Sequence, residues 1–292
     1  MKNDKLLPTL ALGIVAISFG AILIRMVSDA SVFAVSAWRV GIAFLVLLPI
    51  SLHLGTLRLL GGRNLLLSLL SGAFLALHFI LWVASLDYTS VASSVVLVST
   101  SPIFVGLGAK ILIHEPPSRM LKIAIGIAVA GGVVIGWGDM RLGGTAMQGD
   151  LLAVGGAIMA ASYLLIGRRV RKEVPISGYA SATYGAATGI LVISCLVSGK
   201  PLANFPSMDY AWLILLGLGP QLIGHTSLNW ALEYMQASVV SIVTLGEPIG
   251  ATILAYVIFA EPVTIIKAIG GVMILLGIYL GMRTRRDKVA VD

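Results

Sequence analysis

Long apolar runs, separated by short polar or glycine- and proline-containing breaks, dominate the pattern of the chain. A helix needs about 20 apolar residues, at 1.5 Å per residue, to cross a bilayer. Ten runs meet this length, at residues 7–25, 33–52, 65–86, 91–113, 120–137, 149–168, 178–198, 209–231, 237–259 and 263–282. The runs lack the alternation of barrel strands. The pattern therefore predicts an all-α integral membrane protein with ten transmembrane helices.

The composition agrees with this interpretation and narrows the function. Hydrophobic residues make up 58% of the 292 residues and charged residues only 11%, against about 25% charged in soluble domains. The net charge of +7 comes from short basic clusters between apolar runs, without interleaved aromatic residues, which argues against nucleic-acid binding. With one cysteine, no Cys/His cluster and no Walker motif, the sequence predicts neither metal, cofactor nor ATP.

Lysine and arginine are distributed unevenly between alternate loops. With both termini in the cytoplasm, 15 of the 20 basic residues lie inside and five outside. The inner set is Lys2, Lys5, Arg58, Arg63, Lys110, Arg119, Lys122, Arg168, Arg169, Arg171, Lys172, Arg283, Arg285, Arg286 and Lys288, and the outer set is Arg25, Arg39, Arg141, Lys200 and Lys267. The positive-inside rule therefore predicts cytoplasmic termini and a multi-pass protein of a bacterial-type plasma (inner) membrane.

The first apolar run follows Lys2 and Lys5, as the core of a signal peptide would. At about 19 residues it is long for a signal peptide and sufficient for a transmembrane helix. We interpret it as the first span, with cleavage near Ser36 and Ala37 as the alternative.

The chain contains a weak internal repeat. Leu86-Asp87-Tyr88 returns as Leu232-Glu233-Tyr234, 146 residues later, and the same offset relates Pro102 to Pro248 and Glu115-Pro116 to Glu261-Pro262. This divides the chain into two five-helix halves, residues 1–145 and 146–292. Because five is odd, the second half enters the membrane from the opposite side. Inverted repeats are a recurring plan of secondary transporters.

The repeated pattern of apolar span, mid-span proline, span-ending Glu-Pro and glycine-rich next span resembles the drug/metabolite transporter superfamily. It is most similar to the EamA-type ten-helix exporters. The residues that carry the resemblance are Pro102, Glu115, Gly126, Glu247, Pro248, Glu261 and Gly270. The first copy departs from the second, since Ser101 stands where the second has Glu247. The resemblance implies export of amino acids, metabolites or drugs through a central cavity.

Glu247 falls in the middle of the ninth span, where an ionised carboxylate costs several kcal/mol unless it is paired or protonated. It is a candidate proton carrier or a partner for a cationic substrate group, and a protonated structural role is the alternative. Pro102 and Pro248 interrupt helix hydrogen bonding and free the carbonyls of Val98 and Thr244. We expect each proline to be either a hinge or a static kink.

Polar stripes on the third and eighth spans are the other candidates for the cavity lining. Ser71, His78, Trp82 and Ser85 share one face of the third span. Gln221, His225 and Asn229 follow one another every four residues on the eighth. The alternative for both stripes is polar packing between helices. On the seventh span Ser177, Ser181, Tyr184 and Thr188 are expected to hold helices together.

Four further residues complete the candidate site. Ser99 and Ser101 precede Pro102 on the fourth span, Tyr163 lies on the sixth, and Trp38 begins the second on the outer side. Arg39 follows Trp38, and its side chain is expected to reach outward to the membrane surface or to meet a structural partner. If Arg39 faces the interior instead, it would attract a carboxylate.

These expectations together favour a secondary transporter that exports small metabolites by alternating access. Amino acids or related amphipathic compounds are the best candidates for the substrate, and the transport is either facilitated diffusion or exchange for protons. A non-transporting receptor or scaffold is the alternative, and the spans lack the constellation of an intramembrane enzyme. The expected partners are the substrate and the lipid bilayer. The chain already holds both halves, so it is expected to act as a monomer or a loose homodimer.

Overall fold

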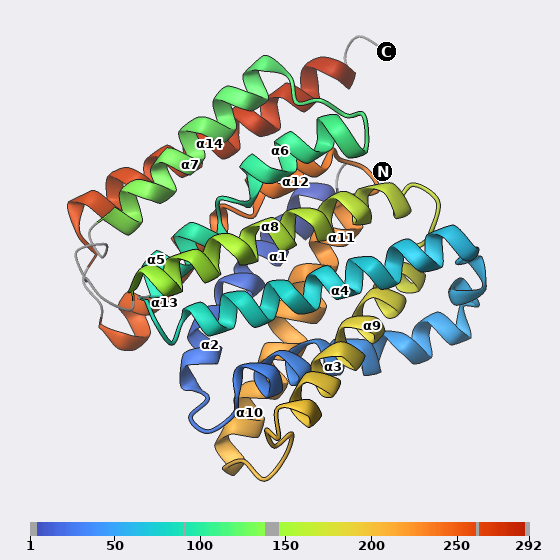
Figure 1. The fold of residues 1–292 in the computed structure, drawn as a ribbon. Helices are drawn as coiled ribbons and strands as arrows, with labels where there is room; N and C mark the ends of the chain where they lie inside the picture. The colour runs from blue at the N-terminus through green and yellow to red at the C-terminus, as the bar shows by residue number, and fades with distance from the viewer. Residues whose placement is uncertain (1–4, 90, 138–145, 261–262, 290–292) are drawn as a thin grey trace.

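The computed structural model describes residues 5–89, 91–137, 146–260 and 263–289, and within them it contains helices and no β-strand (Figure 1). This confirms the all-helical prediction for the described part of the chain. The elements, in chain order, are α1 (Leu6–Ser18), α2 (Gly20–Met26), α3 (Val32–His53), η1 (Thr56–Leu59), α4 (Gly62–Ser85), α5 (Val91–Val98), α6 (Ser101–Leu112), α7 (Arg119–Trp137), α8 (Ala146–Val170), α9 (Ile176–Val197), α10 (Ser207–Leu216), η2 (Gly217–His225), α11 (Thr226–Ala231), α12 (Ala237–Val243), α13 (Gly246–Phe259) and α14 (Ile265–Val289).

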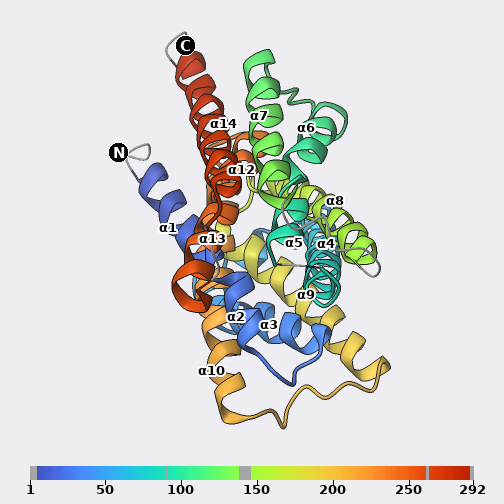
Figure 2. The same ribbon diagram turned by 90° about the vertical axis from the view of Figure 1, so that its left-hand side faces the viewer.

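Eight helical stretches among the described residues are long and apolar enough to cross a membrane. They are Leu6–Met26, Val32–His53, Gly62–Ser85, Ser94–Leu112, Met147–Val170, Ile176–Val197, Ser207–Ala231 and Ala237–Phe259. The two remaining predicted spans correspond to α7 and α14, which pack along each other on one side of the bundle (Figures 1 and 2). These two helices are not among the eight, so the count of ten stays a prediction.

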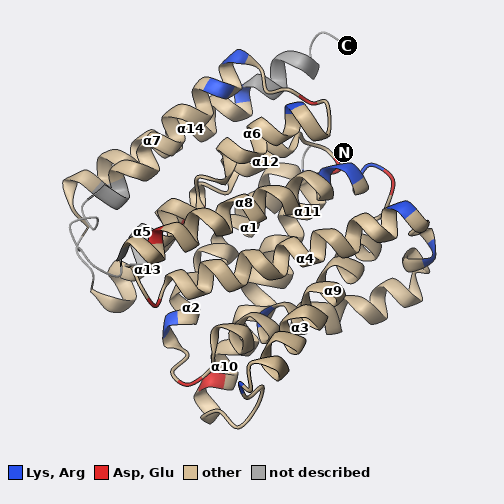
Figure 3. Cartoon of the chain, in the orientation of Figure 1, with Lys and Arg blue, Asp and Glu red and all other residues tan. Residues whose placement is uncertain are grey.

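Basic residues gather at one end of the bundle, which we call the basic end (Figure 3). Helices α3, α6, α8 and α14 end there, and α1, α4, α7 and α9 begin there. Lys110 in the last turn of α6, Lys122 near the start of α7 and Arg168 in the last turn of α8 belong to it. The predicted landmarks Glu261 and Pro262 lie outside the described residues, as do Lys2 and Arg141.

Four of the apolar stretches are discontinuous near their middle. The first bends at Phe19, where the Ser18 hydroxyl donates back to the Ile14 carbonyl at 2.8 Å, a bond that tends to bend helices. The second break lies between α5 and α6 and the third between α12 and α13. The fourth is the π-helical turn η2 around Pro220. π-helical turns often mark functional sites.

Each predicted proline hinge lies at the start of a new helix and not inside a kinked one. Pro102 occupies the first turn of α6 and Pro248 the first turn of α13, where a missing N–H costs nothing. The expected release of the Thr244 carbonyl is wrong, because it accepts the Glu247 N–H at 2.9 Å. A hinge motion at either break stays a prediction.

Small residues allow the central helices to pack closely. A Cβ atom added at Gly72 in α4 would lie 2.4 Å from the carbonyl oxygen of Thr183 and 2.7 Å from the Cβ of Ala186 in α9. The same holds between α7 and α14, where a Cβ at Gly131 would lie 2.6 Å from the carbonyl oxygen of Gly270. The hydrophobic effect does not drive helices together in lipid, so close van der Waals packing of this kind holds them together instead.

Replacing Gly72 with alanine should destabilise the fold, because backbone atoms of α9 must move. We expect Gly72→Ala to lower the free energy of unfolding by about 1–3 kcal/mol, as overpacking does. Gly189 in α9 is the matched control, since a Cβ there meets nothing within 4 Å. Gly189→Ala should be neutral or stabilising. Thermal unfolding in detergent measures both, and equal unfolding temperatures would contradict this account of the contact.

Candidate functional site

A cavity of about 60 Å³ lies where the discontinuous helices meet α3, α4 and α8. Its wall combines ionisable, hydroxyl and aromatic side chains with a few aliphatic ones. The lining residues are Ile17, Arg39, His78, Trp82, Val98, Ser99, Ser101, Ala160, Tyr163, Leu164, His225, Leu228, Thr244 and Glu247. This volume holds a few water molecules, at about 10–15 Å³ each by the same kind of measure. The cavity is therefore narrow in this structure.

Aromatic rings form one side of the cavity. The His78 ring lies parallel to Trp82, with centroids 6.1 Å apart and planes 4° apart. His225 lies 6.5 Å from His78 and 6.4 Å from Tyr163, and meets Phe79 edge-on at 5.4 Å. These rings present flat apolar faces with polar edges, a surface suited to a small amphipathic molecule.

A hydrogen bond to the backbone orients His78. Its Nδ1 lies 3.0 Å from the carbonyl oxygen of Gly156 in α8. A carbonyl only accepts, so Nδ1 carries the proton in this bond, and in the neutral ring Nε2 is left as an acceptor.

Arg39 is the only arginine or lysine in the cavity wall among the described residues. Its side chain is 1% exposed, so the expectation that it reaches the membrane surface is wrong. The guanidinium lies 4.2 Å from the Phe79 ring centroid and 5.4 Å from that of Trp82. Its Nε donates to Oε1 of Gln221 at 3.1 Å. The carbon-rich contacts and the single hydrogen bond fix the charge in place.

Glu247 lines the cavity from the first turn of α13, next to the break between α12 and α13. Thr244 lines it from the same break, and Ser99 and Ser101 line it from the break between α5 and α6. The two broken helices thus bring polar side chains and helix ends to the middle of the bundle. Irregular backbone at this depth is tolerated where it lines a cavity.

Two predicted residues of the eighth span lie directly behind the cavity wall. Gln221 supports Arg39, as described above. Asn229 donates through Nδ2 to the hydroxyl of Tyr163, which lines the cavity, and to that of Tyr184 at 3.2 Å. These residues position the wall and do not form its surface.

The structure does not bring Trp38 to the cavity. Its indole N–H donates to the carbonyl oxygen of Leu202 at 2.8 Å, and its ring meets Tyr210 edge-on at 5.4 Å. Trp38 therefore ties α3 to the segment before α10. The remaining predicted lining residues, namely His78, Trp82, Ser99, Ser101, Tyr163, His225 and Glu247, all lie in its wall.

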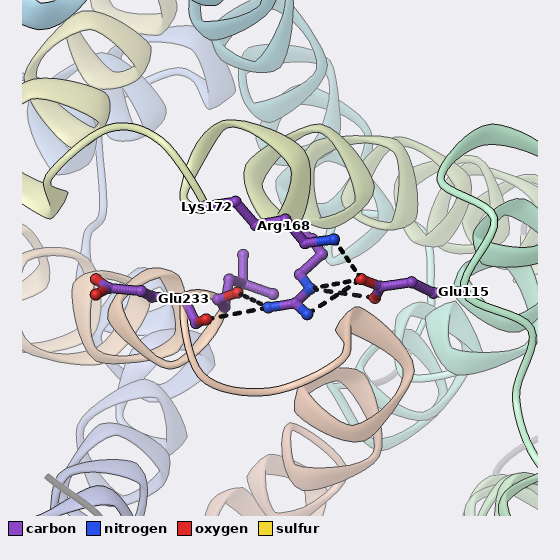
Figure 4. Close-up of polar contacts among 5 residues, drawn as sticks. Glu115, Arg168, Lys172 and Glu233 are labelled. Atoms are coloured by element: carbon purple, nitrogen blue, oxygen red, sulfur yellow. Dashed lines mark hydrogen bonds and ion pairs between the residues drawn. The ribbon is translucent and has the colours of Figure 1, made fainter.

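An ion-pair network closes the basic end (Figure 4). Glu115, just after α6, accepts from Nε and Nη2 of Arg168 at 3.1 Å each and from Nζ of Lys172 at 2.6 Å. Arg168 also donates through Nη1 to the carbonyl oxygens of Leu232 at 2.7 Å and Glu233 at 3.2 Å. One guanidinium thus joins the ends of α6 and α8 to the turn between α11 and α12. Paired contacts of this kind are stronger and more directional than single ones.

The Glu115 carboxyl is ionised in this network. Partial burial opposes its charge, but the hydrogen bonds and charges of Arg168 and Lys172 outweigh burial and hold the pKa of Glu115 below its ordinary value of 4.5. Side chains of Arg168 and Glu115 are 13% and 15% exposed. The pair is therefore screened less than a surface pair.

Arg171 connects this end to the cavity wall. Its Nε donates to the carbonyl oxygen of Asn229 at 3.1 Å, and it also contacts the carbonyl of Val174 and the carboxylate of Glu233. Asn229 in turn holds Tyr163. A continuous set of polar contacts therefore runs from the basic end to the cavity.

Neutral and charged groups also close the opposite end. Asp209, in the first turn of α10, accepts from the backbone N–H groups of Ser28 and Asp29 at 3.1 Å each and from the Ser28 hydroxyl at 3.2 Å. These contacts fix the segment between α2 and α3 against α10.

The sequence showed that Arg39 lies about six residues from the span end, but not that its side chain points into the cavity. The signal that could have revealed it is Gln221, a long amide at mid-span that needs a partner of its own. Thr244, three residues before Glu247, was considered only for its backbone carbonyl and not for its side chain.

Similar proteins are transporters. The chain is 25% identical over 255 residues to the "Uncharacterized transporter YyaM" of Bacillus subtilis (strain 168), covering 83% of this chain and 82% of that protein. It is 24% identical over 283 residues to the human "Solute carrier family 35 member G1", covering 92% of this chain and 76% of that protein. A crystal structure at 17% identity superposes with a TM-score of 0.77 over 95% of this chain and 97% of that one, which shows a shared fold.

One family model matches the chain twice, at residues 5–137 and 147–283. The two matches together take in every wall residue of the cavity and both closed ends. The chain is therefore a membrane transporter protein that belongs to the EamA-like transporter family.

Proposed function

We propose that this protein is a secondary transporter that exports small metabolites, amino acids or related amphipathic compounds, by alternating access through the central cavity. The observation that carries the proposal is the central cavity of ionisable and aromatic side chains at the breaks of discontinuous helices. Such breaks at mid-membrane are where secondary transporters bind their substrates. The family membership supports transport, and drugs are a further substrate class.

The topology that we propose has ten spans, with α7 and α14 as the fifth and tenth. Helix α7 is 19 residues long and α14 is 25, and each has one terminus at the basic end of the bundle. The concentration of lysine and arginine supports a cytoplasmic basic end. Both termini would then be cytoplasmic, in a bacterial-type inner membrane.

The helix contacts support two inverted five-helix halves, residues 1–145 and 146–292. Contacts between the halves come in symmetric pairs: α4 packs on α8 as η2 packs on α1, and α6 packs on α8 as α13 packs on α1. The pairs α3–α9 and α7–α14 map onto themselves. Exchange of conformation between the halves would open the cavity first to one side and then to the other.

Two sets of contacts act as gates in this mechanism. The Glu115–Arg168 network closes the cytoplasmic side, and Asp209 with the segment at Ser28 closes the outer side. Loss of one set lets its side open while the other holds. The polar contacts through Arg171 and Asn229 link the cytoplasmic gate to the cavity wall.

Exchange for protons is the coupling that we propose at Glu247. The groups that face the cavity with it are Arg39, His78, His225 and Tyr163. A carboxylate there holds either a proton or a cationic group of the substrate, not both. Competition between the two would couple their movement.

The central experiment is exchange of labelled compounds by the purified protein in liposomes. The panel contains neutral and aromatic amino acids, a cationic drug and a sugar, each with and without a pH gradient. We expect saturable exchange of one amphipathic class. Absence of exchange across a wide metabolite panel, by protein shown to be folded, would favour the alternative of a non-transporting receptor or scaffold.

Glu247→Gln should remove the dependence of exchange on a pH gradient, because glutamine has no proton to give at this position. Exchange without a gradient should persist, at a reduced rate. Glu173→Gln is the control, since Glu173 lies exposed at the basic end and accepts from Asn64 at 2.8 Å. Proton coupling that survives in Glu247→Gln would assign it to another group.

Glu115→Gln should weaken the cytoplasmic gate in a way that depends on pH. Because the folded pKa of Glu115 is lowered, its stabilisation is present above the ordinary pKa of 4.5 and is lost as pH falls through the lower folded value. The wild-type protein should therefore exceed the variant in thermal stability at pH 7, and this difference should shrink below about pH 4. A difference that is independent of pH would show that the network does not act through charge.

A further inference from the structure

The Arg39 guanidinium has hydrogen-bonding capacity that the described residues do not use. Its Nη1 is buried without a hydrogen-bond partner among them, and so is Nε2 of the neighbouring Gln221. An arginine cannot escape this cost by losing its proton at physiological pH. A buried cation with an unused donor at a cavity is a site that favours an anionic group of a ligand.

The guanidinium is held so that this donor cannot turn away. Phe79 lies under its plane at 4.2 Å, Trp82 lies at 5.4 Å, and Gln221 fixes Nε. Preorganisation of this kind lowers the entropy cost of binding.

The opposite charge faces the same cavity without neutralising Arg39 directly. Glu247 lines the wall, yet within the described part of the chain no ion pair at 4.0 Å or less joins it to Arg39. The two charges attract each other only across a longer distance. A ligand that carries both an anionic and a cationic group matches this pair of wall charges, once the cavity widens beyond its present volume of about 60 Å³.

We infer that the ligand of this cavity is a zwitterion, whose carboxylate pairs with Arg39 and whose ammonium group faces Glu247. Arg39 is then the residue that sets specificity, because molecules without a carboxylate leave it unsatisfied. A phosphate group is disfavoured, because its two negative charges would face a single arginine. The flat rings of His78 and Trp82 would contact the remainder of the molecule. The inference rests on the proposed function for transport, but binding tests it independently.

The test measures binding to the purified wild-type protein in detergent, by equilibrium dialysis and by thermal stabilisation. The probes are glycine, leucine and phenylalanine. Each is compared with its amide, which lacks the carboxylate, and with the matching acid that lacks the amine. We expect at least one amino acid to bind at least tenfold more tightly than both of its analogues, because each analogue leaves one charge unpaired.

Two variants assign this preference to Arg39. Arg39→Gln should abolish the preference for the amino acid over its amide. Gln221→Glu keeps a hydrogen-bond acceptor for Nε of Arg39, so the variant should fold. Its carboxylate would compete with the carboxylate of the ligand for Arg39 and should lower affinity for the amino acid at least tenfold. Arg58→Gln, at an exposed arginine in η1, is the matched control and should bind as the wild type does.

Three outcomes would overturn the inference. They are failure of every amino acid to bind, equal binding of the amides or deaminated acids, and an unchanged affinity for the amino acid in folded Gln221→Glu. Binding with the expected preference but without exchange in liposomes would instead support the zwitterion site and contradict the proposed transport. The two proposals can therefore fail separately.

Discussion

The cost of placing charge and polar backbone inside a membrane protein shapes this structure more than any other constraint. In hydrocarbon each such group needs a partner within the protein. Arg39 and Glu247 meet this need at the centre of the bundle, where discontinuous helices create a cavity that lipid does not reach. Arg39 receives one hydrogen bond partner, two aromatic rings and a distant carboxylate. A buried guanidinium that keeps one donor without a hydrogen-bond partner is suited to binding an anionic group of a ligand.

The same constraint explains where the helices break. A helix end leaves backbone groups without partners, so it is tolerated only against polar neighbours or a cavity. Pro102 and Pro248 start new helices at the cavity, and η2 reaches it through His225. The polar contacts that leave the cavity wall through Asn229 end at Arg171, beside the network of Glu115 and Arg168. Substrate in the cavity and closure at the basic end therefore act on connected residues.

Sequence patterns predicted much of this arrangement, and their failures have physical causes. Apolar runs located the helices, and periodic stripes located His78, Trp82 and His225, because residues four apart share a helix face. The direction of Arg39 could not be predicted, since a long side chain near a span end either snorkels or turns inward according to its neighbours. Trp38 was expected at the cavity, but it hydrogen-bonds to Leu202, a contact 164 residues away that no local pattern contains. The ion-pair partners of Glu115 likewise depend on the tertiary fold.

Alternating exposure of the cavity is the central claim, and accessibility of one engineered cysteine measures it most directly. Ser101 lines the cavity and is buried, and Cys195 is the only native cysteine. In a Cys195→Ser background, Ser101→Cys would be labelled in oriented vesicles with a membrane-impermeant thiol reagent applied to either side. The account predicts labelling from both sides, with the ratio shifted by a transported amino acid. Labelling from one side alone under every condition would contradict it.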